Sequence, residues 1–160
     1  MTDKLVRLDI GSGQSHGDDG WVGVDPFSPN ADLRCFMWNL PHADNTVDEI
    51  YSSHALEHVE KKLVLPTLKE WYRVIKPGGK VTLRVPDLEW CCNWFLAHQT
   101  TGWDMDVIFG NQAHKGEFHQ TGFTKEILKY YVTQAGFIII TYAEISTHAQ
   151  KTLSVELTKQ

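Results

Sequence analysis

The sequence lacks several features that would assign it to common protein classes. No apolar run approaches the ~20 residues that a membrane-spanning helix needs, so no membrane partner is expected. The first residues, MTDKLVRLD, lack the apolar centre of a signal peptide. Only three cysteines occur, Cys35, Cys91 and Cys92, which leaves one thiol unpaired and offers no three-cysteine cradle for an iron–sulfur cluster. We therefore expect a reduced, cytoplasmic protein.

Positive charge is also scarce. The chain has 15 Lys and Arg against 20 Asp and Glu, which gives a net charge of −5. Proteins whose main partner is a nucleic-acid backbone carry an excess of positive charge, so no nucleic-acid partner is expected. The length of 160 residues suits a single domain over 1–160, because no repeat, linker or low-complexity segment divides it.

The most informative segment that is present runs from Leu8 to Asp25, LDIGSGQSHGDDGWVGVD. A first apolar run ends in the Gly-Ser-Gly turn at 11–13, and a second one at 21–24 ends in Asp25. This order predicts a strand, a glycine turn that a ligand approaches closely, and a second strand ending in a carboxylate that suits a ribose diol. The alternative is a loop that merely contains glycines, because a lone glycine motif is weak evidence.

The spacing of this segment narrows the class of nucleotide. A dinucleotide fingerprint needs a third glycine where this chain has His16, and a P-loop needs a GK[ST] triplet that does not follow. Residues 14–20 are close to the shortest possible crossover between parallel strands, and Gly17 and Gly20 disfavour a helix there. We expect a missing or shortened first crossover helix and an adenosine-containing cofactor without phosphates.

The rest of the chain alternates between strand and helix patterns. Strands are predicted at 4–10, 21–25, 32–36, 47–52, 80–86, 137–143 and 152–158. Thr124 is a predicted N-cap for a helix that ends at Gly136. The run 137–140 is apolar on both faces, which is typical of a buried strand, whereas 152–158 alternates like an antiparallel edge strand. The pattern predicts an α/β fold with a doubly wound, mostly parallel Rossmann-like sheet of about seven strands and an antiparallel last strand.

Four sequence blocks, LDIGSGQ, GWVGVDP, LPHADNTVDEIYSSHALEHV and LKEWYRVIKPGGKVTLRVPD, resemble the small class I S-adenosylmethionine (SAM)-dependent methyltransferases of the broad methyltransferase-domain family. A fifth block, FHQTGFTKEILKYYVTQAGF, resembles the last helix and sixth strand of that family. Together the blocks span roughly Lys4 to Ile140. The resemblance implies an enzyme that uses SAM and works by direct displacement at the sulfonium methyl.

The resemblance also implies roles for individual residues. The glycine motif would hold the methionine part of SAM, and Asp25 would bind both ribose hydroxyls. Phe36 stands where the family often places an Asp that binds the adenine amine, so Phe36 and Met37 would recognise adenine through backbone groups and apolar packing. Ser53 and His54 would line the cleft. The implied cofactor-binding residues are Asp9, Gly11, Ser12, Gly13, Asp25, Pro26, Phe36, Met37, Ser53 and His54.

The acceptor side is predicted from a less regular stretch. Residues 100–122 combine glycines with aromatic and polar side chains, so they are predicted as a lid over the acceptor site, with a plain connecting loop as the alternative. A hydroxyl or amine acceptor needs a base, and the candidates in order are His119, His114 and Asp87. We expect a small polar acceptor such as a sugar hydroxyl. A non-catalytic SAM-binding partner subunit is the alternative, and a homodimer stays open.

The eight histidines raise the question of a metal. His54 and His58 are spaced i, i+4, but the order His-Ala-Leu-Glu-His differs from the HExxH order of zinc hydrolases. The LEH triplet is common at this place in the family as a packing and capping element. We therefore expect no metal and predict a structural role for His58.

Overall fold

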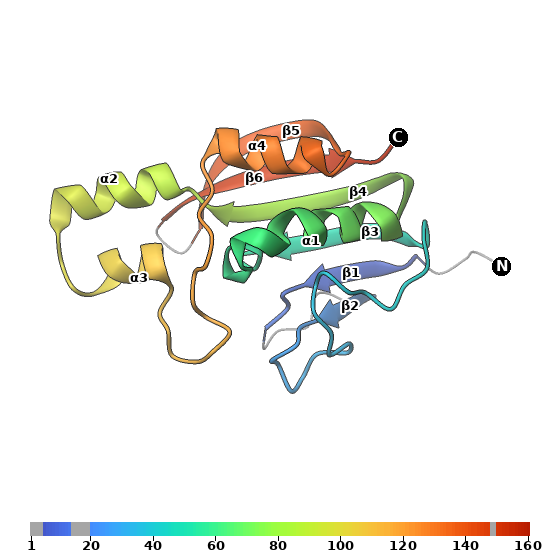
Figure 1. The fold of residues 1–160 in the computed structure, drawn as a ribbon, viewed down its shortest axis with the longest axis horizontal. Coiled ribbons are helices and arrows are strands. Elements are labelled where there is room, and N and C mark those ends of the chain that lie inside the picture. The colour runs from blue at the N-terminus through green and yellow to red at the C-terminus, as the bar shows by residue number, and fades with distance from the viewer. Residues whose placement is uncertain (1–4, 14–19, 148–149) are drawn as a thin grey trace.

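Short runs of alternating apolar and polar residues build one six-stranded sheet with the order β2-β1-β3-β4-β6-β5 (Figure 1). The computed structural model describes residues 5–13, 20–147 and 150–160. Neighbouring strands from β2 to β4 are parallel, and β6 is antiparallel to both β4 and β5. This confirms the α/β class and the mostly parallel sheet with an antiparallel last strand. The strands are β1 (Arg7–Ile10), β2 (Trp21–Val24), β3 (Val47–Ser53), β4 (Ile75–Pro86), β5 (Ile138–Thr147) and β6 (Gln150–Thr158).

Helices connect the later strands. Two of them begin at side-chain caps: the Asp87 carboxylate accepts from the amides of Glu89 and Trp90 at the start of α2, and the Thr124 hydroxyl accepts from the amide of Ile127 at the start of α4. In the described ranges, no helix is both long and apolar enough to cross a bilayer. The helices are η1 (Leu56–His58, a 3₁₀ turn), α1 (Lys61–Val74), α2 (Leu88–His98), α3 (Trp103–Phe109) and α4 (Lys125–Gln134).

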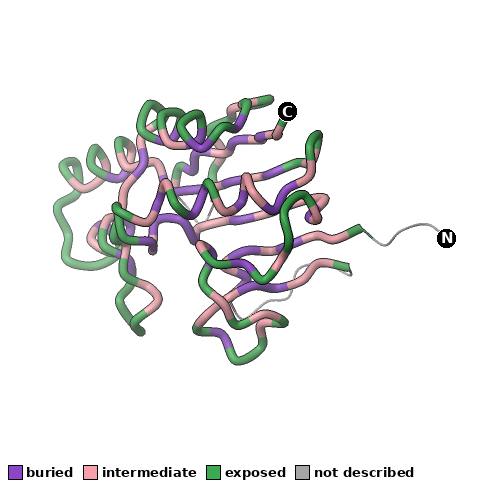
Figure 2. The backbone as a smooth tube through the Cα atoms, turned by 45° about the vertical axis from the view of Figure 1, so that its right-hand side comes forward, coloured by how far each residue is buried: buried purple, intermediate pink, exposed green. Residues whose placement is uncertain are grey.

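The core lies on one face of the sheet. Helices α1 and α4 lie on the same face and contact each other (Figure 1). Along β1, residues 81–85 of β4 and residues 153–157 of β6, every second side chain is buried. In Figure 2 the sheet contains stretches of purple interrupted by pink. The opposite face carries partly exposed side chains, including Trp21 edge-on to Tyr51 and Arg84 over the Tyr51 ring. Within the described residues no helix covers that face, so the second helical layer of a doubly wound sheet is not part of what the structure describes.

The strand predicted at 32–36 is reduced to a single parallel bridge between Val24 and Leu33. Too few residues separate the two for a crossover, which needs about a dozen. In addition, the Asp32 carboxylate accepts from the amide of Gly23, in the place where a neighbouring strand would bond. The sheet therefore has six strands, one fewer than expected. The predicted loss of the first crossover helix concerns Gln14 to Asp19, which lie outside the described residues.

The last two strands exchange the roles that their patterns indicated. The run predicted to be buried lies in β5 at the edge of the sheet, where Ile138 and Ile140 are exposed and Phe137 alone of the run is buried. The segment predicted as an edge strand is β6, which lies between β4 and β5. An alternating strand can occupy the interior because this sheet is covered on one face only, so it needs a single apolar face.

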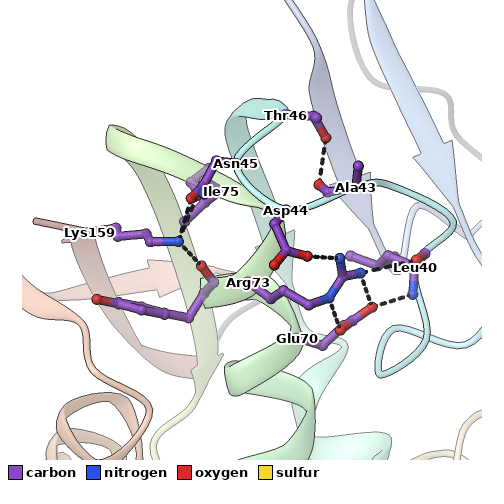
Figure 3. A network of polar contacts seen from close by, with 10 residues as sticks. Leu40, Ala43, Asp44, Asn45, Thr46, Glu70, Arg73, Ile75 and Lys159 are labelled. Atoms are coloured by element: carbon purple, nitrogen blue, oxygen red, sulfur yellow. Dashed lines mark hydrogen bonds and ion pairs between the residues drawn. The ribbon is translucent and has the colours of Figure 1, made fainter.

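A polar network attaches the loop before β3 to α1 (Figure 3). The Arg73 guanidinium donates to both carboxylate oxygens of Glu70 at 2.8 Å and to the carboxylate of Asp44 at 2.7 Å. One of the two Glu70 oxygens, Oε1, also accepts from the amide of Leu40. These bonds lower the pKa of the Glu70 carboxyl, and the hydrogen bond from Arg73 makes the largest contribution. The ammonium of Lys159 binds the side chain of Asn45 in the same loop. The network fixes the segment that follows Phe36 along the chain.

Candidate functional site

The glycine turn follows β1 at the carboxyl edge of the sheet. The amide of Gly11 donates to the carbonyl of Val24 at 2.8 Å, and the residue has a φ of +78°. A Cβ at Gly11 would lie 2.2 Å from the Cβ of Ala55, so only glycine fits between the turn and the loop after β3. Gly13 also has a positive φ, of +59°, but a Cβ there would meet no atom of the described residues within 4 Å. The turn therefore presents open backbone beside Gly13, as a bound ligand requires.

Asp25 follows β2 and organises this edge of the sheet. One carboxylate oxygen accepts from the Gly13 amide at 3.1 Å, and the other accepts from the amides of Phe27 at 2.8 Å and Ser28 at 2.9 Å. A carboxylate offers about four lone-pair sites, so these three bonds leave one acceptor position, on the oxygen that faces the turn. Asp25 thus joins the two predicted parts of the site, the glycine turn and the ribose-binding acid.

The other predicted residues of the turn surround these two. Asp9 is half-buried in β1, and burial raises the pKa of its carboxyl. Ser12 is 8% exposed, and its hydroxyl lies where a Cβ at Gly23 would approach within 3.0 Å. Pro26 is partly exposed and directs the chain away from β2 after Asp25. The strands β1 and β2 are therefore held close together at the glycine turn.

Aromatic rings form a wall after β2. Phe36 is 45% exposed, stacks on Trp38 at 4.6 Å between ring centroids, and meets the edge of Phe27 at 6.3 Å. Met37 is buried, and its carbonyl accepts from the indole of Trp71 in α1. Exposed, mutually supported aromatic faces suit an apolar planar ligand such as adenine.

Ser53 and His54 lie at the end of β3, as predicted, but the imidazole of His54 faces the β5–β6 hairpin. Its Nε2 contacts the Thr147 hydroxyl at 2.9 Å and the Thr152 hydroxyl at 3.2 Å. Its Nδ1 lies 3.4 Å from the side-chain amide nitrogen of Gln150. His54 also adopts a φ of +53°, which turns the chain sharply after the strand. The ring therefore links the end of β3 to the hairpin.

The stretch predicted as an irregular lid contains a helix, α3, which packs against α2. The sequence of α3 lacks a clear apolar face because a polar residue, Asp104, is one of its buried positions. The indole N–H of Trp94 in α2 donates to the Asp104 carboxylate. Residues 100–102 before α3 and 110–122 after it are irregular. The later part connects α3 to α4 in Figure 1, and a Cβ at Gly116 would lie 2.8 Å from the ring of Phe27. The 110–122 segment thus reaches the aromatic wall.

Five hydrogen bonds hold 118–121 to η1 and the residue after it. The amides of Gln120 and Thr121 donate to the carbonyl of Glu57, and their side chains donate to the carbonyls of His58 and Val59. The fifth bond joins a ring nitrogen of His58 to the carbonyl of Phe118. This part of the predicted lid is consequently fixed on the core.

The three candidate bases differ in their surroundings. Asp87 is engaged in capping α2, and His114 is exposed and lies 2.9 Å from Glu117. His119 borders a small hollow of about 10 Å³, close to the volume of one water, which Glu57 and Cys91 also line. Burial lowers the pKa of His119, which favours the neutral imidazole. Burial likewise raises the pKa of the Cys91 thiol, to about 12. Of the three candidates, only His119 combines burial, a neutral ring and a place at the hollow.

Glu57 is the residue of this region that the sequence analysis did not single out. It is 2% exposed, and neither carboxylate oxygen accepts a hydrogen bond from any described residue. His54 Nδ1 lies 3.5 Å from one of these oxygens. The LEH triplet could have drawn attention to Glu57, because this acid stands in an otherwise apolar segment beside a histidine. An acid that such a segment buries is costly to the fold unless another group binds it.

The comparisons with known proteins agree with this geometry. A family model described as "Methyltransferase domain" matches residues 27–83. A SAM-dependent methyltransferase of Methanosarcina mazei has 18% sequence identity and a TM-score of 0.70, over 99% of this chain and 94% of that chain. The fold is that of the SAM-dependent methyltransferases. A second methyltransferase structure, from Mesorhizobium loti, aligns with a TM-score of 0.68 and 18% identity over 97% of this chain and 91% of that one.

Other relatives extend the comparison of this methyltransferase fold. The 1,6-didemethyltoxoflavin-N1-methyltransferase of Burkholderia thailandensis, solved with its substrate and S-adenosylhomocysteine, is 15% identical with a TM-score of 0.67, over 97% of this chain and 71% of that chain. An uncharacterized methyltransferase of Mycobacterium tuberculosis is 35% identical over 48% of this chain. The alignment spans only 37% of that relative.

Proposed function

We propose that this protein transfers the methyl group of SAM to a small polar acceptor, with a sugar hydroxyl as the first acceptor class to test. One observation supports this best: Asp25 joins the glycine turn after β1 to the end of β2 and keeps one acceptor position toward that turn. In a parallel sheet, ligands bind at this carboxyl edge. A carboxylate beside open glycine backbone suits a ribose whose neighbouring group at the turn carries no phosphate.

The residues at the edge of the sheet fit SAM in three respects. Gly13 has free space where a side chain would otherwise stand, Asp25 has a lone pair for a ribose hydroxyl, and Phe36 offers an exposed ring for adenine. SAM supplies an electrophilic methyl group on its sulfonium. The chain would contribute by binding and orienting the two reactants and by excluding water between them.

His119 is the proposed group on the acceptor side. A neutral imidazole can take the proton of a hydroxyl or amine during transfer, and burial favours the neutral ring here. The segment 110–122 would cover the acceptor, because its tip at Gly116 packs on Phe27 beside the aromatic wall. His114 and Asp87 remain the second and third candidates for the base.

Calorimetric titration with SAM and S-adenosylhomocysteine, followed by a screen of acceptors with labelled methyl, tests the proposal. We expect saturable binding of both ligands and label transfer to at least one hydroxyl or amine acceptor. His119→Ala should lower kcat by ~10²–10⁴ and leave SAM affinity near wild type, with the exposed His98, replaced by Ala, as the matched control. Tighter binding of NAD than of SAM would refute the cofactor, and SAM binding without turnover across the screen would favour a partner subunit.

A further inference from the structure

Three side chains that can bind a metal converge where the 110–122 segment meets η1. A carboxylate oxygen of Glu57 and a ring nitrogen each of His58 and His119 all lie within 4.8 Å of one another. The two imidazoles meet edge to face with centroids 5.0 Å apart. The three residues come from two segments that are distant in the sequence, so the fold alone brings them together.

The buried carboxylate is the strongest observation. Glu57 is 98% buried, yet none of the described residues donates a hydrogen bond to either of its oxygens. A charged group in this position is costly unless a cation or a donor compensates it. His54 Nδ1 lies 3.5 Å from one of these oxygens without forming a hydrogen bond to it, and the same nitrogen faces the side-chain amide of Gln150 at 3.4 Å. The surroundings therefore leave carboxylate lone pairs that a bound cation would engage.

The imidazole of His58 is prepared as a ligand. Its Nδ1 lies 3.1 Å from the carbonyl oxygen of Phe118. A carbonyl oxygen only accepts, so Nδ1 carries the hydrogen and Nε2 keeps its lone pair. Metal-binding histidines have this arrangement, in which a backbone carbonyl fixes the tautomer and the orientation of the ring.

We propose that Glu57, His58 and His119 bind a divalent transition-metal ion of the zinc type, which fastens the 110–122 segment to η1. Two imidazoles and one carboxylate favour Zn²⁺ over Mg²⁺ or Ca²⁺, which prefer oxygen ligands. Metal–ligand bonds of about 2.0–2.2 Å place ligand atoms about 3.4 Å apart, so binding would shorten separations of up to 4.8 Å by at most about 1.4 Å. The water-sized hollow beside Glu57 and His119 provides room for a fourth ligand from solvent.

This inference goes beyond methyl transfer and does not depend on it. A metal ion would occupy the lone pair that His119 needs as a base, so the two roles exclude each other in the same molecule. It also differs from the expectation drawn from the motif order, because the third ligand comes from the distant His119 and not from His54. The HExxH motif places its two histidines one helical turn apart, so it cannot reveal a ligand as distant in the sequence as His119.

Titration of the chelator-treated protein with Zn²⁺, in the absence of SAM, tests the site. We expect one saturable site, a higher Tm with Zn²⁺ and no comparable effect of Mg²⁺. Co²⁺ in the same site should give the visible absorption of a four-coordinate ion. His119→Gln and Glu57→Gln should each weaken Zn²⁺ binding by ~100-fold or more. Glu57→Gln should fold, because it removes a buried charge that has no hydrogen-bond partner among the described residues.

Two histidines outside the cluster serve as matched controls. His98→Gln removes an exposed ring stacked on Trp94, and His114→Gln removes an exposed ring beside Glu117, so neither change should alter Zn²⁺ affinity. The proposal is overturned if no saturable Zn²⁺ binding occurs, if His119→Gln binds as well as the wild type, or if His114→Gln loses the site instead. Because SAM is absent from every measurement, these outcomes do not test methyl transfer itself, although a bound metal ion would exclude His119 as its base.

Discussion

Replacing Asp25 with Asn should separate the two tasks of this carboxylate. An amide keeps one oxygen that can still accept from Phe27 and Ser28, but its nitrogen cannot accept from Gly13 or from a ribose hydroxyl. A hydrogen bond to a charged acceptor is worth about 1.5–3 kcal/mol, and about 1.4 kcal/mol is tenfold in affinity. Asp25→Asn should therefore weaken SAM binding about 10- to 150-fold.

The same change should cost little stability. It removes one partly exposed bond to the turn, worth about 1 kcal/mol, so the Tm should fall by about 2–4 °C. Asp25→Ala would strand all three amides and should lower the Tm two to three times as far, which makes it the poorer variant for measuring affinity.

Calorimetry with S-adenosylhomocysteine and its 2′-deoxy and 3′-deoxy analogues completes the test. If Asp25 binds the ribose, removing the hydroxyl that it contacts should weaken wild-type binding strongly and binding to Asp25→Asn only slightly, because the partner is already gone. Binding within twofold of wild type by a folded Asp25→Asn protein would show that the carboxylate only shapes the turn.

Two further predictions concern stability. Gly11→Ala should destabilise the protein by several kcal/mol and abolish SAM binding, because the new Cβ collides with Ala55. Gly13→Ala should cost only about 1–2 kcal/mol, because its Cβ meets no atom of the described residues. Both residues have a positive φ, so a comparison of the thermal unfolding of the two variants isolates the effect of the clash. The folded-state pKa of Glu70 is lowered, chiefly by Arg73, so its stabilisation is present above the unfolded pKa near 4.5 and is lost as the pH falls through the folded value. Unfolding of Glu70→Gln should show a lower Tm than wild type at pH 7 and a difference that shrinks below about pH 4; a constant difference would contradict the ion pair.

The sequence predicted most of the fold, because the deciding signals are local. Thr124 is the N-cap of α4, and each of the six strands of the sheet overlaps a predicted strand range. The errors came from non-local effects. Leu33 has a strand-like neighbourhood but lies too close along the chain to Val24 to pair for more than one bridge. Apolar Ile138 and Ile140 indicated a buried strand, yet the order of strands leaves them at an edge.

The candidate site was predictable only where one segment forms it. The glycine turn and Asp25 are neighbours in sequence, and the structure joins them through the Gly13 amide. The carboxylate of Glu57 and the ring of His119 approach because 118–121 folds back on η1, and no spacing rule anticipates such an encounter. The helix α3 was missed for a related reason, since its stabilising partner Trp94 belongs to another helix.

If the 110–122 segment covers an acceptor as proposed, the attachment of 118–121 to η1 limits how that acceptor enters. Opening the whole 110–122 segment would break five hydrogen bonds at once, whereas its tip from 111 to 117 touches the rest of the molecule at Phe27. The base of this tip is pinched, because the His119 amide donates to the carbonyl of Phe109. The tip is thus a short, closed loop that can be exchanged without disturbing the sheet. Under the proposed function, exchanging this loop would change the contacts to the acceptor while the glycine turn, Asp25 and the core stay unchanged.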